Sequence, residues 1–81
     1  MDTRERIIKC FSHVGVLLED THVDIDINDY IEDSFMYIQF MVEVEQEFSI
    51  EFPDEVYTLD SVKSLNGLAE IVSELLEKQH T

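Results

Sequence analysis

The spacing of apolar residues predicts three amphipathic helices, in residues 3–18, in residues 34–48 and from residue 61 onward. Each segment repeats its apolar residues at intervals of three and four, which places them on one face of a 3.6-residue turn. The three stripes are Ile7, Phe11, Val14 and Leu18; Ile38, Met41, Val44 and Phe48; and Val62, Leu65, Leu68, Val72 and Leu75.

The segment between the first two helices, residues 19–33, has a different pattern. Val23, Ile25 and Ile27 alternate with acidic residues, a period of two that is typical of a strand. Since no other segment alternates in this way, we interpret it as a long acidic loop whose isoleucines enter the core. We expect Tyr30 and Ile31 to hold its end. Loops of this length are often functional.

The second helix is predicted to end at residues 49–53, because Pro53 lacks a backbone donor and disfavours helix at Phe52. Residues 54–58 then predict one short helical turn. The fold class that follows is all-α: a small four-helix bundle of three main helices and one short helix, with a long loop between helices 1 and 2. Residues 1–81 form a single domain. The predicted core is Leu18, Ile38, Met41, Val44, Phe48, Leu65, Leu68 and Val72.

The second predicted helix has more apolar residues than one buried face needs. Besides its stripe it contains Phe35, Met36, Tyr37, Phe40 and Val42. We therefore expect some of these side chains to be exposed, which is unusual on a chain with so many charges.

Charge narrows the classes of partner. The formal net charge is −14, and residues 10–62 contain no lysine or arginine. Nucleic acid and anionic membrane both need a basic protein surface, so neither is an expected partner. An acidic field attracts basic partner surfaces, although acids also simply keep a small domain soluble. The chain has a single cysteine, Cys10, and we find neither a membrane-length apolar run nor a signal-peptide pattern at its start. These features favour a cytoplasmic location.

Ser34 is the residue with the most specific expected chemistry. It lies between the acidic loop and the second helix, where a serine is commonly an N-cap. The alternative is a modification site, because the positive end of a helix dipole would stabilise a phosphate diester on an exposed hydroxyl.

The run from Asp33 to Glu55 resembles the acyl carrier protein family of phosphopantetheine-dependent carriers, stand-alone type. The similar motifs are Asp33-Ser34-Phe35 at the start of the second helix, Glu45-Gln46-Glu47-Phe48 at its end, and Glu51-Phe52-Pro53-Asp54-Glu55 before the short helix. The resemblance implies that Ser34 carries phosphopantetheine from coenzyme A and that acyl intermediates are held on this arm as thioesters. It implies fatty-acid, polyketide or related secondary-metabolite biosynthesis and no catalytic activity of the chain's own.

The same resemblance implies the partners. These are a phosphopantetheinyl transferase and acyl-loading enzymes, synthases or transferases with basic docking patches, which would act on a monomeric carrier. The implied contact residues are Asp33, Phe35, Val42, Glu43, Glu45 and Gln46. Two alternatives stay open: a peptidyl or aminoacyl carrier, including a D-alanyl carrier, and an unmodified acidic helical interaction module.

Two rival chemistries have weaker support. Asp24, Asp26 and Asn28 match the first ligand positions of an EF-hand loop, but Asp29 and Phe35 stand where its glycine and bidentate glutamate belong, so no metal site is predicted. The three histidines lie in separate segments and do not suggest a catalytic cluster with a serine and an acid.

Overall fold

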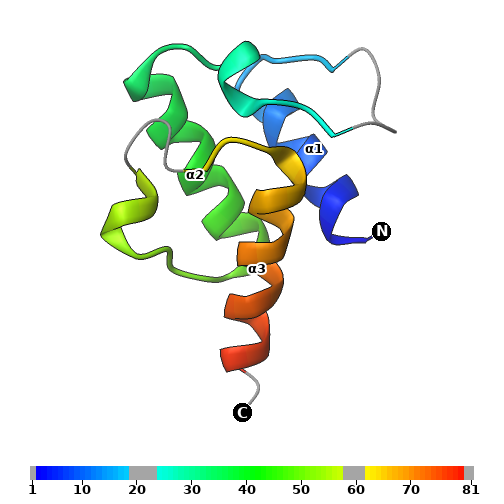
Figure 1. Ribbon diagram of the computed structural model, residues 1–81, viewed down its shortest axis with the longest axis vertical. Helices are drawn as coiled ribbons and strands as arrows, with labels where there is room; N and C mark the ends of the chain where they lie inside the picture. The colour runs from blue at the N-terminus through cyan, green and yellow to red at the C-terminus, as the bar shows by residue number, and fades with distance from the viewer. Residues whose placement is uncertain (1, 19–23, 58–61, 80–81) are drawn as a thin grey trace.

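A computed structural model describes residues 2–18, 24–57 and 62–79 of the chain. The elements are the α-helices α1 (Thr3–His13), α2 (Ser34–Phe48) and α3 (Leu65–Gln79), and the 3₁₀ helices η1 (Ile27–Asp29) and η2 (Asp54–Tyr57). Figure 1 shows α1, α2 and α3 packed together, with η2 beside α2. The described part of the chain is therefore small and helical. The short fourth helix predicted from the sequence corresponds to η2, which is one turn of 3₁₀ helix. None of its helices combines the length and apolar character needed to cross a membrane.

α1 is shorter than the sequence pattern predicted. Its N-terminus is capped by Asp2, whose carboxylate accepts a hydrogen bond from the Glu5 N–H at 2.8 Å. The helix ends at His13 rather than Leu18 because Gly15 adopts a φ of 85°. This left-handed conformation suits glycine and turns the chain so that the Val16 N–H donates to the Phe11 carbonyl. Leu18, predicted to be core, is only half-buried.

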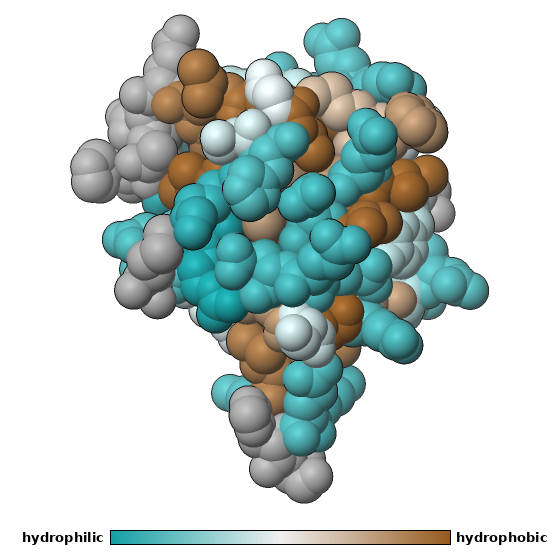
Figure 2. All heavy atoms as spheres, turned by 180° about the vertical axis from the view of Figure 1, so that it is seen from behind, coloured by the Kyte–Doolittle hydropathy of each residue, from teal (hydrophilic) through white to brown (hydrophobic). Residues whose placement is uncertain are grey.

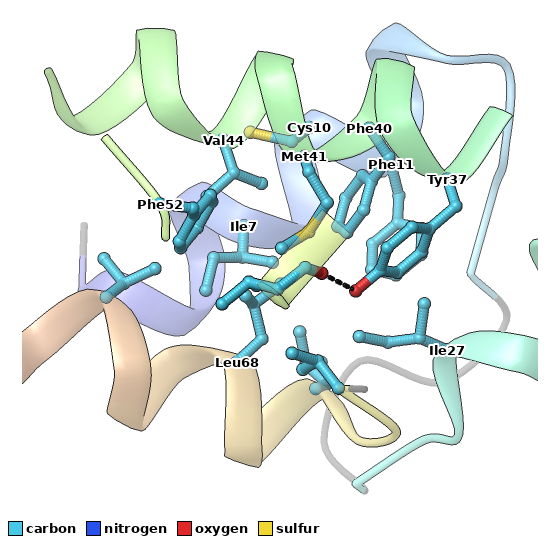
Figure 3. Packing of buried hydrophobic residues seen from close by; sticks show 14 of the residues in the cluster. Ile7, Cys10, Phe11, Ile27, Tyr37, Phe40, Met41, Val44, Phe52 and Leu68 are labelled. Atoms are coloured by element: carbon cyan, nitrogen blue, oxygen red, sulfur yellow. Dashed lines mark hydrogen bonds between the residues drawn. The ribbon is translucent and has the colours of Figure 1, made fainter. Parts of the chain in front are cut away.

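α2 buries a face that is rotated by one residue from the predicted stripe at its N-terminal end. Tyr37 is fully buried, whereas Ile38, predicted to be core, is 42% exposed. Met41, Val44 and Phe48 are buried as predicted. Tyr37 continues their spacing at intervals of four, three and four, and its hydroxyl donates to the Val56 carbonyl at 2.7 Å (Figure 3). This hydrogen bond satisfies the polar end of a buried tyrosine.

The segment before α2 contributes to the core and pairs with the start of α3. Ile27 and Ile31 are buried, as expected, while Tyr30 is exposed. Contrary to the interpretation as an unpaired loop, the segment with alternating residues pairs with the chain just before α3. Asp26 and Ser64 form an isolated antiparallel bridge. The Ile27 N–H donates to the Lys63 carbonyl at 2.7 Å. These contacts fix the path of the chain into α2.

α3 begins at Leu65, later than the predicted start near residue 61, which lies outside the described residues. Two side chains satisfy N–H groups of its first turn. The Ser64 hydroxyl accepts from the Gly67 N–H, and the Asp24 carboxylate accepts from the Asn66 N–H, both at 2.9 Å. The first turn of a helix has free N–H groups that need such partners.

The core lies between the three α-helices and includes most of the predicted residues. Figure 3 shows side chains of α1, α2 and α3 meeting there. The Phe11 and Phe40 rings pack with their centroids 4.3 Å apart. The predicted core residues that are buried are Met41, Val44, Phe48, Leu65, Leu68 and Val72.

Candidate functional site at the start of α2

Ser34 is an exposed residue at the first position of α2. The N-cap is the preceding residue, Asp33, which has an extended backbone and accepts a hydrogen bond from the Phe35 N–H at 3.1 Å. The interpretation of Ser34 as the N-cap is therefore wrong. Because Asp33 caps the helix, the Ser34 hydroxyl is left at the surface without that structural role.

The surroundings of Ser34 suit a phosphate diester on its oxygen. The hydroxyl lies at the N-terminal end of a 15-residue helix, where the peptide dipoles favour an anion. Its sequence neighbours Glu32, Asp33 and Phe35 are all exposed, so an attached chain has open access to solvent and to a second protein. The exposed carboxylates of Glu32 and Asp33 make this end of the helix acidic outside the first turn.

The outward face of α2 is uncharged and largely apolar along its first three turns. Phe35 is 67% exposed, Ile38 42% and Val42 37%. Gln39 and Gln46, also exposed, lie on the same face. Ile38 and Val42 line a shallow groove with His13 and Val14 from the end of α1. In the rear view of Figure 2, where the start of α2 comes to the upper right, hydrophobic side chains gather beside a broad polar area.

Each glutamate of α2 has an internal partner. The Glu43 carboxylate lies 3.2 Å from His13 Nδ1, and the Glu47 carboxylate lies 3.2 Å from Arg6 Nη2. Glu45 accepts a hydrogen bond from the Phe52 N–H at 2.6 Å. These contacts connect α2 to α1 and to the chain that leads into η2.

Glu45 also faces the Tyr57 side chain on η2. Burial raises the pKa of the Tyr57 hydroxyl above its usual value, and the hydrogen bond and negative charge of Glu45 raise it further. The hydroxyl therefore stays protonated at neutral pH and can act as a donor to the Glu45 carboxylate.

The predicted contact residues fall into two groups. Asp33, Phe35, Val42 and Gln46 are exposed on the surface around or beyond Ser34, whereas Glu43 and Glu45 are half-buried and internally bonded. Two residues of this surface were not predicted as contacts: Ile38, which was expected in the core, and His13, which was expected to lie apart from the other candidate residues. The surplus of apolar residues in α2 was the available signal for Ile38.

The residues of the rival chemistries have structural roles in the described chain. Asp24 caps α3, and Asp26 accepts from the Asn28 N–H at 2.9 Å to cap η1. No group of three or more potential metal ligands occurs within residues 2–18, 24–57 and 62–79. His22 and His80 lie outside these ranges.

Cys10 is a poor nucleophile in this fold. It is fully buried in α1, and burial, together with the charges of Glu47 and Glu43, raises the pKa of its thiol from 9.0 to about 12. A reactive cysteine needs an exposed site that stabilises the thiolate. The thiol instead lies 3.4 Å from the Arg6 carbonyl, to which it donates.

Comparison with protein families assigns a class to this arrangement. The sequence model of the phosphopantetheine attachment site family matches residues 5–72, and the chain belongs to that family. Its members are carrier domains whose prosthetic group, phosphopantetheine, derives from coenzyme A, and they interact with phosphopantetheinyl transferases and biosynthetic enzymes. The exposed Ser34 hydroxyl at the N-terminus of α2 fits such a group. No match was found among curated proteins or among solved structures.

Proposed function

We propose that the chain is a carrier protein with phosphopantetheine attached to Ser34, and that it holds acyl intermediates on this arm as thioesters. The observation that supports the attachment point most directly is the position of Ser34. Ser34 is the exposed first residue of α2 and lies within the residues that the family model matches. Because Asp33 caps the helix, the Ser34 hydroxyl is not needed as a cap.

The attachment step is a phosphoryl-type transfer performed by a separate transferase. The Ser34 oxygen attacks the phosphorus of coenzyme A that bears the pantetheine, and an O–P bond forms. The pyrophosphate bond breaks, 3′,5′-ADP leaves with the bonding electrons, and the hydroxyl proton passes to a base of the transferase. The first turn of α2 stabilises the diester anion, while the chain itself positions the hydroxyl.

The proposed cargo is an acyl group of fatty-acid, polyketide or related secondary-metabolite biosynthesis. A second candidate is an aminoacyl or D-alanyl group, because the Asp33-Ser34-Phe35 triplet also resembles carriers of that kind. In either case the chain is a cytoplasmic shuttle without catalytic activity. We expect it to be a monomer, because two copies with a net charge of −14 repel each other.

The docking surface proposed for partner enzymes is built around Ser34. Asp33 and Phe35 adjoin the attachment point, and Val42 and Gln46 extend the exposed surface along α2. Glu43 and Glu45 remain predicted partner contacts. Each already has a hydrogen bond within the chain, with which a partner would have to compete.

The experiment is an intact-mass measurement after incubation with coenzyme A and a promiscuous phosphopantetheinyl transferase. The wild-type protein should gain the mass of one phosphopantetheine, and Ser34→Ala should gain none. Ser73→Ala is the matched control, because Ser73 is an exposed helical serine on α3 and its loss should not affect modification. A folded wild-type protein that gains no mass beside an active control carrier would return the chain to the unmodified interaction module.

A further inference from the structure

We propose that the shallow groove between the end of α1 and the outward face of α2 is a non-covalent binding site for the pantetheine part of the chain's own arm. This inference rests on the proposed function, because it takes the arm to be attached to Ser34. The groove, called the α1–α2 groove below, is lined by residues from both helices: His13, Val14, Ile38, Gln39, Val42 and Glu43.

The α1–α2 groove lies along α2 from the attachment point. Ser34, Ile38 and Val42 follow one another at intervals of four, so their side chains form one row on the helix surface. At 1.5 Å per residue, Ile38 is about 6 Å and Val42 about 12 Å beyond Ser34 along the helix axis. An arm that follows this row enters the groove after one helical turn.

The length of the arm matches these positions. An extended chain advances about 1.2 Å per bond, and about fourteen bonds separate the Ser34 oxygen from the thiol sulfur, so the arm spans about 17 Å. Its two geminal methyl groups lie about 5 Å from that oxygen, close to the level of Ile38, and its two amides lie at about 8 and 13 Å. The part of the arm between phosphate and sulfur therefore falls within the groove.

The lining of the groove suits the chemistry of the arm. Val14, Ile38 and Val42 offer apolar side chains to its methyl and methylene groups, whose burial is favourable. The exposed amide of Gln39 has both donors and acceptors, which the amides of the arm can use. The groove has a volume of about 520 Å³, within the range of sites that hold small molecules.

The end of α1 provides the second wall of the groove. The helix ends at His13, and Val14 is its C-cap residue. His13 Nδ1 lies 3.2 Å from the Glu43 carboxylate, and this contact joins the two walls. The apolar lining from α1 therefore lies beside α2 because of how the two helices pack.

Charge and tethering identify the arm as the occupant. An anionic ligand or a second copy of the chain would meet the Glu43 carboxylate and a net charge of −14, whereas pantetheine is uncharged. A short tether holds its ligand at an effective concentration on the order of millimolar, so a groove with a dissociation constant of the same order is about half occupied. The sulfur extends past Val42 towards the exposed Gln46, so the thiol stays accessible.

Binding of the arm to this groove couples its release to partner binding. Val42 belongs both to the α1–α2 groove and to the docking surface proposed above. A partner that covers Val42 displaces the arm, and the arm is then free to enter the active site of that partner.

The first experiment needs no modification of Ser34 and uses free pantetheine as the probe. Added at about 10 mM to isotope-labelled, unmodified protein, it should shift the methyl NMR signals of Val14, Ile38 and Val42, with a dissociation constant on the order of millimolar. Ile50 and Leu75, which line a separate hollow, are the reference and should not shift. Unchanged groove signals would overturn the inference and leave the proposed function standing.

The second experiment compares the unmodified and the fully modified protein. Val14 is the most informative reporter, because it lies 20 residues before Ser34 and on another element. Its methyl signals should shift on modification, and nuclear Overhauser effects should connect the geminal methyl groups of the arm to Val14 and Ile38. Signal changes confined to residues 33–35, or arm contacts only with η2, would overturn the inference while leaving the attachment to Ser34 intact.

Variants test whether the apolar lining holds the arm. Ile38→Gln should weaken binding about tenfold, which lowers the occupancy from about half to about a tenth and the Val14 shift on modification about fivefold. Leu17→Gln is the matched control, since Leu17 is 82% exposed and does not line the groove, and Ile38→Leu keeps the apolar contact. Both should retain most of the shift. An equal shift in Ile38→Gln and wild type would contradict the inference, and absence of modification of wild type would overturn the proposed function as well.

Discussion

The thiol of the phosphopantetheine arm should be the only fast-reacting thiol of the native modified protein. The perturbation is the modification itself, because it adds an exposed thiol to a chain whose single cysteine, Cys10, is fully buried. A count of reactive thiols therefore reports the state of Ser34 directly.

The expected difference in rate follows from the environment of Cys10. Raising a thiol pKa from 9.0 to about 12 lowers the thiolate fraction at pH 8 about a thousandfold. A more basic thiolate is also a better nucleophile, and this recovers roughly 15- to 30-fold, so the pKa alone slows the reaction by roughly 30- to 60-fold. Burial adds to this, because the reagent reaches the sulfur only when the fold opens.

The assay is reaction with a chromogenic aromatic disulfide at pH 8, in native buffer and in denaturant. Native unmodified protein should show no fast thiol, and native modified protein should show one. Denaturant should add one thiol to each. Ser34→Ala treated with the transferase and coenzyme A is the control and should behave as unmodified protein. Rapid reaction of Cys10 in native unmodified protein, at the rate of a free thiol, would refute the reasoning.

Three further predictions concern the fold around the site and are tested by thermal melts. Asp33→Ala removes the N-cap of α2 and should lower the free energy of unfolding by about 1 kcal/mol, or roughly 4–8 °C in Tm. Ser34→Ala should leave the free energy of unfolding within about 0.5 kcal/mol of wild type. Equal losses in the two variants would contradict the assignment of Asp33 as the cap. Gly15→Ala should cost about 1–2 kcal/mol from the left-handed φ alone, because the added Cβ meets no neighbouring atom within 4 Å; an unchanged melt would contradict the helix end described for α1. Tyr37→Phe removes the donor to the Val56 carbonyl and should cost about 1 kcal/mol, so a stability equal to wild type would argue against that hydrogen bond.

The register of α2 was only partly predictable from the sequence. Met41, Val44 and Phe48 fit two stripes equally well, one continued by Tyr37 and one by Ile38. Because isoleucine is more hydrophobic than tyrosine, hydropathy favours Ile38 over Tyr37 as the core residue. The structure reverses this choice because the Val56 carbonyl, 19 residues further along the chain, accepts the tyrosine hydroxyl. Periodicity along a single helix contains no information about that partner.

The helix ends illustrate a signal that was present and a signal that was not. Gly15 indicated the end of α1, since glycine just beyond a helix commonly adopts a left-handed φ, although the apolar stripe continues past it to Leu18. The start of α3 depends in part on Asp24, which is 42 residues away from the N–H group it caps. A contact over that distance becomes visible only in the folded chain.

The candidate site was largely predictable, but the roles of its charges were not. Ser34, Asp33 and Phe35 follow from the local motif, and all three are exposed where it places them. Glu43 and Glu45 were expected to face partners because the family resemblance implies charged contacts at their positions. Their bonds to His13 and to the Phe52 N–H depend on how α1 and the η2 segment pack against α2.

The most direct test of the central claim is to locate the phosphopantetheine on the chain. After treatment with coenzyme A and the transferase, cleavage after Glu32 and Glu43 releases the peptide of residues 33–43, in which Ser34 is the only serine and no threonine or cysteine occurs. Fragmentation of this peptide should place the added group on Ser34. An unmodified 33–43 peptide, with the added mass found on a peptide containing another serine, would contradict the assignment of Ser34 as the attachment site.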